Sequence, residues 1–266
     1  MTEDGTGPVG NGGESWNEQA GPKQASRNLL RLLKPVIIIP EQGKYVDPNA
    51  VSSRFYNCFH YSLLSKDRTG VNLTVGITSA NPGEGKTLVA SNLAVSLAVA
   101  NQRDTVLVDM NMRSPRIHRI FGTELSPGLV EALSDTTIRI SKTQIEHLCV
   151  LPAGNLGGSL VVDYIPPDGE GAPSAADSAS VGLEHVAAFR DVLYSLRQEF
   201  EFVIVDMPAM QEPFTPLLLV HQMDGILVVV DAKRTRHEDI QRIFQHVNEK
   251  QILGFVFNRA SESIIL

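Results

Sequence analysis

Apolar residues gather in short runs that alternate with helical patterns from residue 71 onward. Apolar runs typical of buried strands span residues 71–78, 105–109, 147–151, 202–205, 226–230 and 252–257. Helical spacing of apolar residues is found at 86–99, 128–133, 181–200 and 238–248. Strands that alternate with helices predict right-handed crossovers and an α/β fold with a mostly parallel sheet flanked by helices. The runs are apolar on both faces, which is typical of strands buried between two layers.

The rest of the chain divides around this block. Residues 1–27 are rich in Gly, Glu, Asn and Gln and predict a disordered tail. Residues 28–70 are expected to form a helical and linker segment, in which 28–34 fits a short basic docking helix or a helix at the domain edge. Residues 71–260 form the main domain, with a flexible Gly- and Pro-rich insertion at about 155–180, and 261–266 form a short C-terminal tail.

Composition narrows the function classes. A chain of 266 residues fits one α/β domain with tails, and a net charge of -7 argues against a nucleic-acid partner. No apolar run approaches the roughly 18 residues that span a bilayer, and the N-terminus lacks an apolar signal core. The two cysteines, Cys58 and Cys149, lack metal-ligand spacing and are expected to be reduced thiols. We therefore expect a cytoplasmic protein.

A phosphate-binding loop follows the first predicted strand. Residues 80–87 read Ala-Asn-Pro-Gly-Glu-Gly-Lys-Thr and lead into the first helix, although Ala80 stands where the pattern has its first glycine. Backbone N–H groups in such a loop can point at one phosphate chain, and the helix N-terminus adds partial positive charge. Lys86 can reach the β- and γ-phosphates, and the Thr87 hydroxyl can ligate Mg²⁺. The candidate residues for binding ATP in this loop are Pro82, Gly83, Glu84, Gly85, Lys86, Thr87 and Leu88.

Two aspartates follow predicted strands at the edge where open α/β sheets bind nucleotides. Asp109 and Asp206 each end an apolar run. Mg²⁺ prefers oxygen ligands and retains waters, so one or two carboxylates suffice. Asp206 would bind a metal-bound water, and Asp109 would orient or deprotonate an attacking oxygen. An isolated aspartate would be read as a loop cap, but three signals in this order favour a site in which Lys86, Asp109 and Asp206 are catalytic and Thr87, Asp109 and Asp206 hold the metal.

The motifs resemble those of a known family. The loop at 79–87, the stretch 106–115 with Asp-x-Asn-x-Arg at 109–113, the stretch 202–208, and shorter matches at 151–154 and 254–259 look like those of bacterial tyrosine kinases of capsule and exopolysaccharide assembly. The resemblance covers about residues 50–260. It implies a P-loop NTPase fold of the deviant-Walker, partition-ATPase-like superfamily.

The resemblance also implies functional details. Asn111 and Arg113 would bind the cofactor, and Asn258 would contact adenine from the loop after the last strand. The expected partner is a membrane polysaccharide co-polymerase or chain-length regulator, which would place the protein at the inner face of the membrane. A homo-oligomer is a further expectation.

Several departures from the family weaken the expected kinase activity. Asn111 replaces an aspartate and removes one negative charge near Mg²⁺. The last tyrosine is Tyr194, so the usual C-terminal tyrosine cluster is missing. Of the residues that join subunits into a ring, the corresponding stretch 52–59 keeps only Arg54, and the insertion replaces a Pro-Asn-Pro stretch.

Three functions remain open from the sequence. The first is an active tyrosine kinase or ATPase that serves exopolysaccharide synthesis or export. The second is a non-catalytic ATP-dependent regulator of the membrane partner. The third is a partition-type positioning ATPase, which is disfavoured by the acidic charge and by Asn81, which stands where those proteins carry a lysine.

Overall fold

The computed structural model describes residues 36–40, 72–135, 137–155, 183–212 and 217–260. The predicted tails 1–27 and 261–266, and all of the predicted insertion after residue 155, lie outside the described residues. Within the segment 28–70, the described part is the strand β1 (Val36–Pro40), which the sequence analysis did not predict.

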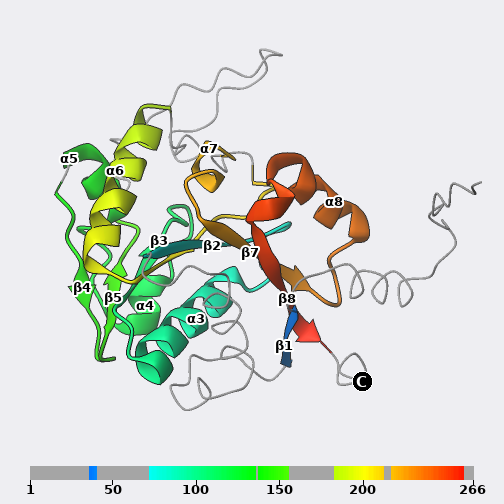
Figure 1. Ribbon diagram of the computed structural model, residues 1–266, viewed down its shortest axis with the longest axis horizontal. Helices are drawn as coiled ribbons and strands as arrows, with labels where there is room; N and C mark the ends of the chain where they lie inside the picture. The colour runs from blue at the N-terminus through cyan, green and yellow to red at the C-terminus, as the bar shows by residue number, and fades with distance from the viewer. Residues whose placement is uncertain (1–35, 41–71, 136, 156–182, 213–216, 261–266) are drawn as a thin grey trace, which may run out of the picture. The chain divides into compact units, whose positions relative to one another are not determined.

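The described strands form one eight-stranded sheet in the order β1-β8-β7-β2-β6-β3-β5-β4 (Figure 1). All neighbouring pairs are parallel except β4 and β5. The remaining strands are β2 (Leu73–Ser79), β3 (Thr105–Asp109), β4 (Ser141–Lys142), β5 (Leu148–Leu151), β6 (Phe202–Asp206), β7 (Gly225–Asp231) and β8 (Ile252–Ala260). The prediction of a mostly parallel α/β sheet is confirmed.

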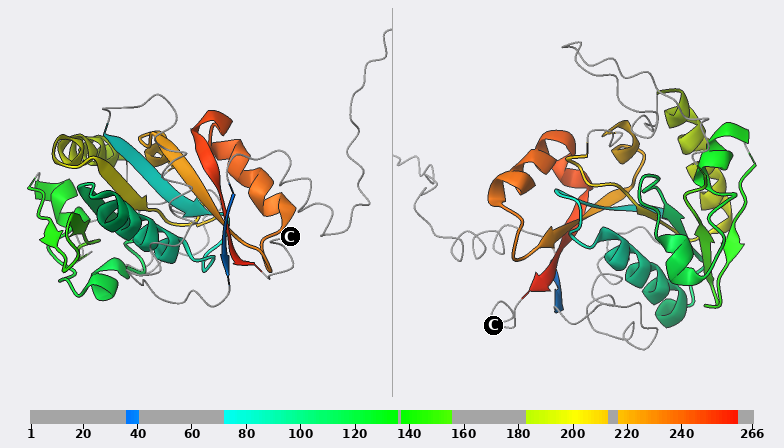
Figure 2. Two further views of the ribbon diagram at one scale, coloured as in Figure 1. Left: turned by 60° about the horizontal axis from the view of Figure 1, so that its bottom comes forward. Right: turned by 180° about the vertical axis from the view of Figure 1, so that it is seen from behind.

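Helices lie on both faces of this sheet (Figure 2). They are α3 (Lys86–Asn101), α4 (Ile117–Phe121), α5 (Leu129–Asp135), α6 (Leu183–Glu199), α7 (Leu217–Val220) and α8 (His237–His246), with a 3₁₀ turn, η2 (Glu249–Gln251). The chain moves from β2 toward β3 through α3, whereas it moves in the opposite direction along the sheet through α6, α7 and α8. Right-handed crossovers therefore place α3 on one face and α6, α7 and α8 on the other.

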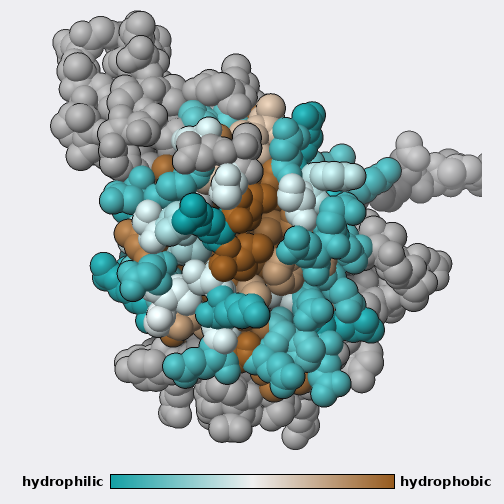
Figure 3. Space-filling model, turned by 90° about the vertical axis from the view of Figure 1, so that its left-hand side faces the viewer, coloured by the Kyte–Doolittle hydropathy of each residue, from teal (hydrophilic) through white to brown (hydrophobic). Residues whose placement is uncertain are grey.

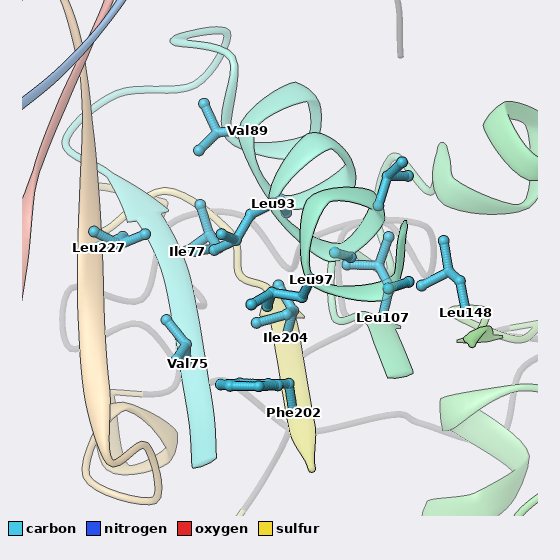
Figure 4. Close-up of a cluster of buried hydrophobic side chains, with 14 of the residues drawn as sticks. Val75, Ile77, Val89, Leu93, Leu97, Leu107, Leu148, Phe202, Ile204 and Leu227 are labelled. Atoms are coloured by element: carbon cyan, nitrogen blue, oxygen red, sulfur yellow. The ribbon is translucent and has the colours of Figure 1, made fainter. Parts of the chain in front are cut away.

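The main core lies between α3 and the sheet (Figure 4). Val89, Leu93 and Leu97 of α3 point toward strand residues such as Ile77 and Ile204, and each of these five side chains is almost fully buried. Because α3 carries apolar residues on most of its surface and is covered over most of its length, it is a buried helix, and its N-terminus is held firmly at the carboxyl edge of the sheet.

Several boundaries differ from the prediction for local reasons. The strand predicted from His147 begins at Leu148, because His147 has a left-handed backbone with φ of 62° and cannot continue an extended strand. The last strand runs on to Ala260. The short elements α4, β4, α7 and η2 were not predicted, because each is too short to show a periodic pattern.

Figure 3 views the side of the molecule that carries α5, α6 and β4, where hydrophobic residues occupy the centre of the described surface and polar residues surround them. Within the described part of the chain, no helix has both the length and the apolar character required to cross a membrane.

We expect the α3 core to dominate stability. Leu97 is fully buried in α3, and its replacement by alanine leaves a cavity against the sheet. Leu97→Ala should lower the free energy of unfolding by about 2–5 kcal/mol in urea titrations. Val99→Ala in the same helix, where the side chain is 45% exposed, should change it by less than about 0.5 kcal/mol. Equal losses in the two variants would contradict this placement of the core.

Candidate functional site

The loop between β2 and α3 has the conformation of a phosphate cradle. Gly83 and Gly85 have left-handed backbones with φ of 79° and 99°, and α3 begins directly after Gly85. A Cβ atom on Gly85 would lie 2.1 Å from Nδ2 of Asn258, so this position requires glycine on two grounds. The loop therefore brings successive N–H groups to the positive end of a buried 16-residue helix.

Thr87 and Asp206 meet at the first turn of α3. The Thr87 hydroxyl donates a hydrogen bond of 2.6 Å to Oδ2 of Asp206, which ends β6 and is 1% exposed. The second carboxylate oxygen, Oδ1, is buried and has no hydrogen-bond partner among the described residues. A buried carboxylate oxygen is costly to leave unpaired, so this atom needs a water or a cation.

Asp109 lies beside Asp206 and holds the loop that follows β3. The two aspartates are register partners on adjacent parallel strands. Oδ1 of Asp109 accepts the backbone N–H of Asn111 at 3.1 Å, and Oδ2 accepts those of Arg116 and Ile117 at 3.1 and 3.2 Å. Asp109 thus fixes the path of residues 110–117 and, through it, the positions of Asn111 and Arg113.

Burial and mutual repulsion perturb the charges at this edge. Burial and, to a lesser extent, the neighbouring Asp109 together raise the pKa of Asp206 to about 7, against the lowering effect of the Thr87 hydroxyl and Lys86. Burial also raises the pKa of Asp109 to about 6, although the three backbone N–H groups oppose it. Burial lowers the pKa of Lys86, and the carboxylates of Asp206, Glu212 and Glu84 partly offset this effect. A cation placed among these groups would favour both carboxylates in their charged form.

A cavity of about 790 Å³ opens above these groups. Its lining includes the predicted residues Pro82, Gly83, Gly85, Lys86, Thr87, Leu88, Asn111, Arg113 and Asn258. The buried Asp109 and Asp206 lie beneath it, at the ends of β3 and β6. The structure therefore brings together residues from four separate stretches of sequence, and the volume is suited to a nucleotide-sized ligand.

The Glu84 side chain lies apart from the other predicted residues. It is 3% exposed, does not line the large cavity, and its carboxylate accepts hydrogen bonds from the Asn81 backbone and side chain at 3.2 and 3.1 Å. The Asn81 amide also donates to Asp239 of α8 at 3.2 Å. Only the backbone of Glu84 can therefore contribute to the phosphate cradle.

Asn258 requires a correction. It lies within β8 and not in the loop after the last strand, because β8 continues through Ala260. Its Nδ2 donates to the carbonyl oxygen of Glu84 at 2.9 Å, and its Oδ1 accepts the N–H of Arg259 at 2.9 Å. Its amide thus braces the phosphate loop while it lines the cavity.

Other cavity residues were not identified from the sequence. Ser114, Arg116, Ile120, Glu212 and Arg259 also line the cavity. Arg116, Ser114 and Ile120 lie in or just after the loop that Asp109 organises, so their proximity to the motif was the one available signal. Glu212 lies in the segment after β6, which no motif marks, whereas Arg259 ends the stretch 254–259, in which the sequence analysis selected only Asn258.

The residues present fit both Mg²⁺ and a triphosphate. The unpaired buried oxygen of Asp206 and the adjacent Thr87 hydroxyl form an oxygen donor set of the kind that Mg²⁺ prefers. The left-handed glycines, together with the Lys86 ammonium at the helix N-terminus, form a positively polarised cradle of the kind that binds phosphate groups.

Comparisons with known proteins agree with this geometry. The chain is 28% identical over 220 residues to the tyrosine-protein kinase CpsD of Streptococcus pneumoniae, a match that covers 80% of this chain and 86% of CpsD. The structure superimposes on the kinase domain of the Escherichia coli tyrosine kinase ETK with a TM-score of 0.66 at 19% identity, covering 88% of this chain and 94% of that domain. The chain is similar to bacterial tyrosine-protein kinases.

Two further comparisons concern family models and a relative that is matched over only part of its length. No family model matches the chain. The succinoglycan biosynthesis transport protein ExoP of Rhizobium meliloti is 27% identical over 220 residues, but the match covers 79% of this chain and 26% of ExoP. The kinase-like part thus exists both as most of a chain, as in CpsD, and as one section of a larger protein.

The raised pKa of Asp206 predicts a pH-dependent cost of folding. The folded state binds this proton more tightly than the unfolded chain, so stability falls as the pH rises from about 4 toward the folded pKa of about 7. Asp206→Asn should raise the free energy of unfolding of the ligand-free protein by on the order of 1–3 kcal/mol at pH 8, and by less at pH 5.

Urea titrations at the two pH values measure this difference. Asp191→Asn, at an exposed position on α6, serves as the control and should show no such pH dependence. A gain from Asp206→Asn that is the same at pH 5 and pH 8 would contradict the proposed cost.

Proposed function

We propose that the chain binds ATP with Mg²⁺ in the large cavity and transfers the γ-phosphoryl group to a tyrosine hydroxyl. The observation that carries the proposal is the meeting of Lys86, the Thr87 hydroxyl and the unpaired oxygen of Asp206 at the N-terminus of α3. The similarity to CpsD over four fifths of the chain supports tyrosine as the acceptor.

Each residue has a role that its position supports. The ammonium group of Lys86 would contact the β- and γ-phosphate oxygens, and the loop N–H groups would bind the remaining ones. The Thr87 hydroxyl would ligate Mg²⁺, and the Asp206 carboxylate would accept a hydrogen bond from a metal-bound water. Mg²⁺ bound there supplies neutralisation of the charge on the phosphates.

The loop held by Asp109 would form the acceptor side of the cavity. Arg113 and Arg116 lie there with Ile120, which is 41% exposed. Guanidinium groups at this end would stabilise the charge that spreads over the phosphoryl oxygens during transfer. The bond from the γ-phosphorus to ADP breaks, the tyrosine oxygen binds that phosphorus, and the hydroxyl proton leaves to a base or to water.

A second candidate is an ATP-dependent regulator with little turnover. Asn111 lines the cavity where the family that the chain resembles has an aspartate, and both oxygens of Asp109 are already bound to backbone N–H groups. These observations favour weak chemistry with intact nucleotide binding. In either case we propose that the chain acts at the inner face of the membrane with a polysaccharide co-polymerase. The match to one section of ExoP supports a functional link with polysaccharide transport.

Lys86 should be indispensable for turnover. Lys86→Met removes the cation that faces the phosphates and should lower phosphate transfer from γ-labelled ATP by at least ~100-fold. Lys142→Met, on the exposed edge strand β4, should leave the rate unchanged. The assay uses the purified protein with and without a membrane polysaccharide co-polymerase from the same organism. Label on tyrosine would decide for the kinase, whereas ATP binding without transfer under both conditions would decide for the regulator.

Asn111 should limit the rate if the missing charge matters. Asn111→Asp restores a carboxylate at the cavity wall and should raise turnover at saturating Mg²⁺ by roughly 10-fold, and it should lower the Mg²⁺ concentration needed for half-maximal rate. Asn155→Asp, at an exposed position away from the cavity, provides the matched control. An unchanged rate and an unchanged Mg²⁺ requirement would remove this explanation for weak activity.

A further inference from the structure

A chain of polar contacts runs behind the phosphate loop from Glu84 to Arg259. The Thr235 hydroxyl donates a hydrogen bond to the buried carboxylate of Glu84. The Thr235 hydroxyl oxygen in turn accepts a hydrogen bond from the N–H of Asp231 at 2.9 Å. The Asp231 carboxylate, which is 1% exposed, pairs with the guanidinium of Arg259 at 2.5 Å. The back of the loop is thus connected to a cationic side chain that lines the large cavity.

A second series of hydrogen bonds, through Asn258, also connects the phosphate loop with Arg259. Asn258 donates to the Glu84 carbonyl and accepts from the Arg259 N–H, each at 2.9 Å. Its Nδ2 fills the space that a Cβ on Gly85 would need. Both paths therefore connect the phosphate loop with the carboxyl end of β8.

The position of Arg259 along the sheet corresponds to one end of the cavity. β8 lies two strands from β2, on the side away from β6 and β3. At about 4.8 Å between strands, this end is roughly 10 Å from the strand that leads into the loop. The opposite end carries Arg113 and Arg116, which suit anionic groups. The β8 end therefore suits the part of a nucleotide that is farthest from its phosphates.

The local chemistry of Arg259 also fits a flat ring. Its backbone is left-handed with φ of 56°, a conformation that costs on the order of 1 kcal/mol in a residue other than glycine and that gathers at ligand-binding positions. Asp231 holds one end of the guanidinium, and the side chain is 39% exposed. A guanidinium fixed at its edge has its planar face available, and such faces stack on aromatic rings.

We propose that Arg259 holds the base of the bound nucleotide against its guanidinium plane and that Asp231 and Thr235 tie this contact to the phosphate loop. This inference rests on the proposed function, because it assumes that the cavity binds a nucleotide. Arg259 is then a base-contacting residue, and Thr235 is a positioning residue for the loop.

The test compares a ligand that has a base with one that lacks it. Calorimetry with Mg²⁺ measures the affinities of ATP and inorganic tripolyphosphate for the wild type, Arg259→Met and Arg259→Lys. Both substitutions should weaken ATP binding by roughly 10-fold, which is the size of one lost stacking contact. They should change the affinity for tripolyphosphate by less than about 2-fold. Arg234→Met, next to the smaller hollow behind the loop, should change neither.

The outcomes separate this inference from the proposed function. Equally weakened binding of both ligands, or wild-type ATP affinity in Arg259→Lys, would overturn the proposed base contact. ATP binding by the wild type would in that case still support the proposed function. A wild type that binds neither ligand would overturn both.

Thr235 tests the connection to the loop. Thr235→Val removes the hydroxyl between Glu84 and Asp231 without changing the cavity lining, so it should weaken ATP and tripolyphosphate alike by about 3- to 10-fold. Thr235→Ser keeps the hydroxyl and should restore both affinities. Unchanged affinity for both ligands in Thr235→Val would overturn the connection.

Discussion

Two carboxylates buried side by side at the carboxyl edge of the sheet are the constraint on which the site depends. Asp109 and Asp206 are register partners on β3 and β6, and burial together with their mutual repulsion raises the pKa of Asp206 to about 7. Such a pair is costly unless hydrogen bonds or a cation compensate it. Backbone N–H groups of the following loop donate to Asp109, and the Thr87 hydroxyl and the Lys86 ammonium group lie near Asp206. One oxygen of Asp206 still has no hydrogen-bond partner among the described residues. That remaining oxygen is why we assign a metal-bound triphosphate to this edge.

The rest of the fold positions groups around this pair. The buried helix α3 and its left-handed glycines fix the cradle, Asp109 fixes the loop with the guanidinium groups, and the hydrogen bonds through Thr235 and Asn258 connect the back of the cradle to β8. The cavity consequently has a phosphate centre with a different chemistry on either side. This division gives one physical basis for both proposed functions, because in the proposal nucleotide binding depends on the cradle and turnover depends on the acceptor side of the cavity.

The sequence predicted the features that local pattern determines. Buried runs located the six central parallel strands, and the spacing of glycine, lysine and threonine located the cradle, because helix and loop geometry act over a few residues. It could not show that the Glu84 side chain turns away from the cavity, since that depends on Thr235 about 150 residues later in the chain. It did not give β1 or place Asn258 within a strand, because edge pairing depends on tertiary contacts. Arg259 was missed, although it ends the matched stretch 254–259, because its place in the cavity depends on the order of the strands in the sheet.

The most direct test of the central claim is a crystal structure with ATP and Mn²⁺, whose anomalous signal locates the metal. The account predicts one metal peak within coordination distance of Thr87 Oγ1, with a metal-bound water on Oδ1 of Asp206 and the triphosphate against the N–H groups of residues 83–87. A metal or triphosphate located elsewhere in the molecule, or clear density for neither at saturating ligand, would contradict it.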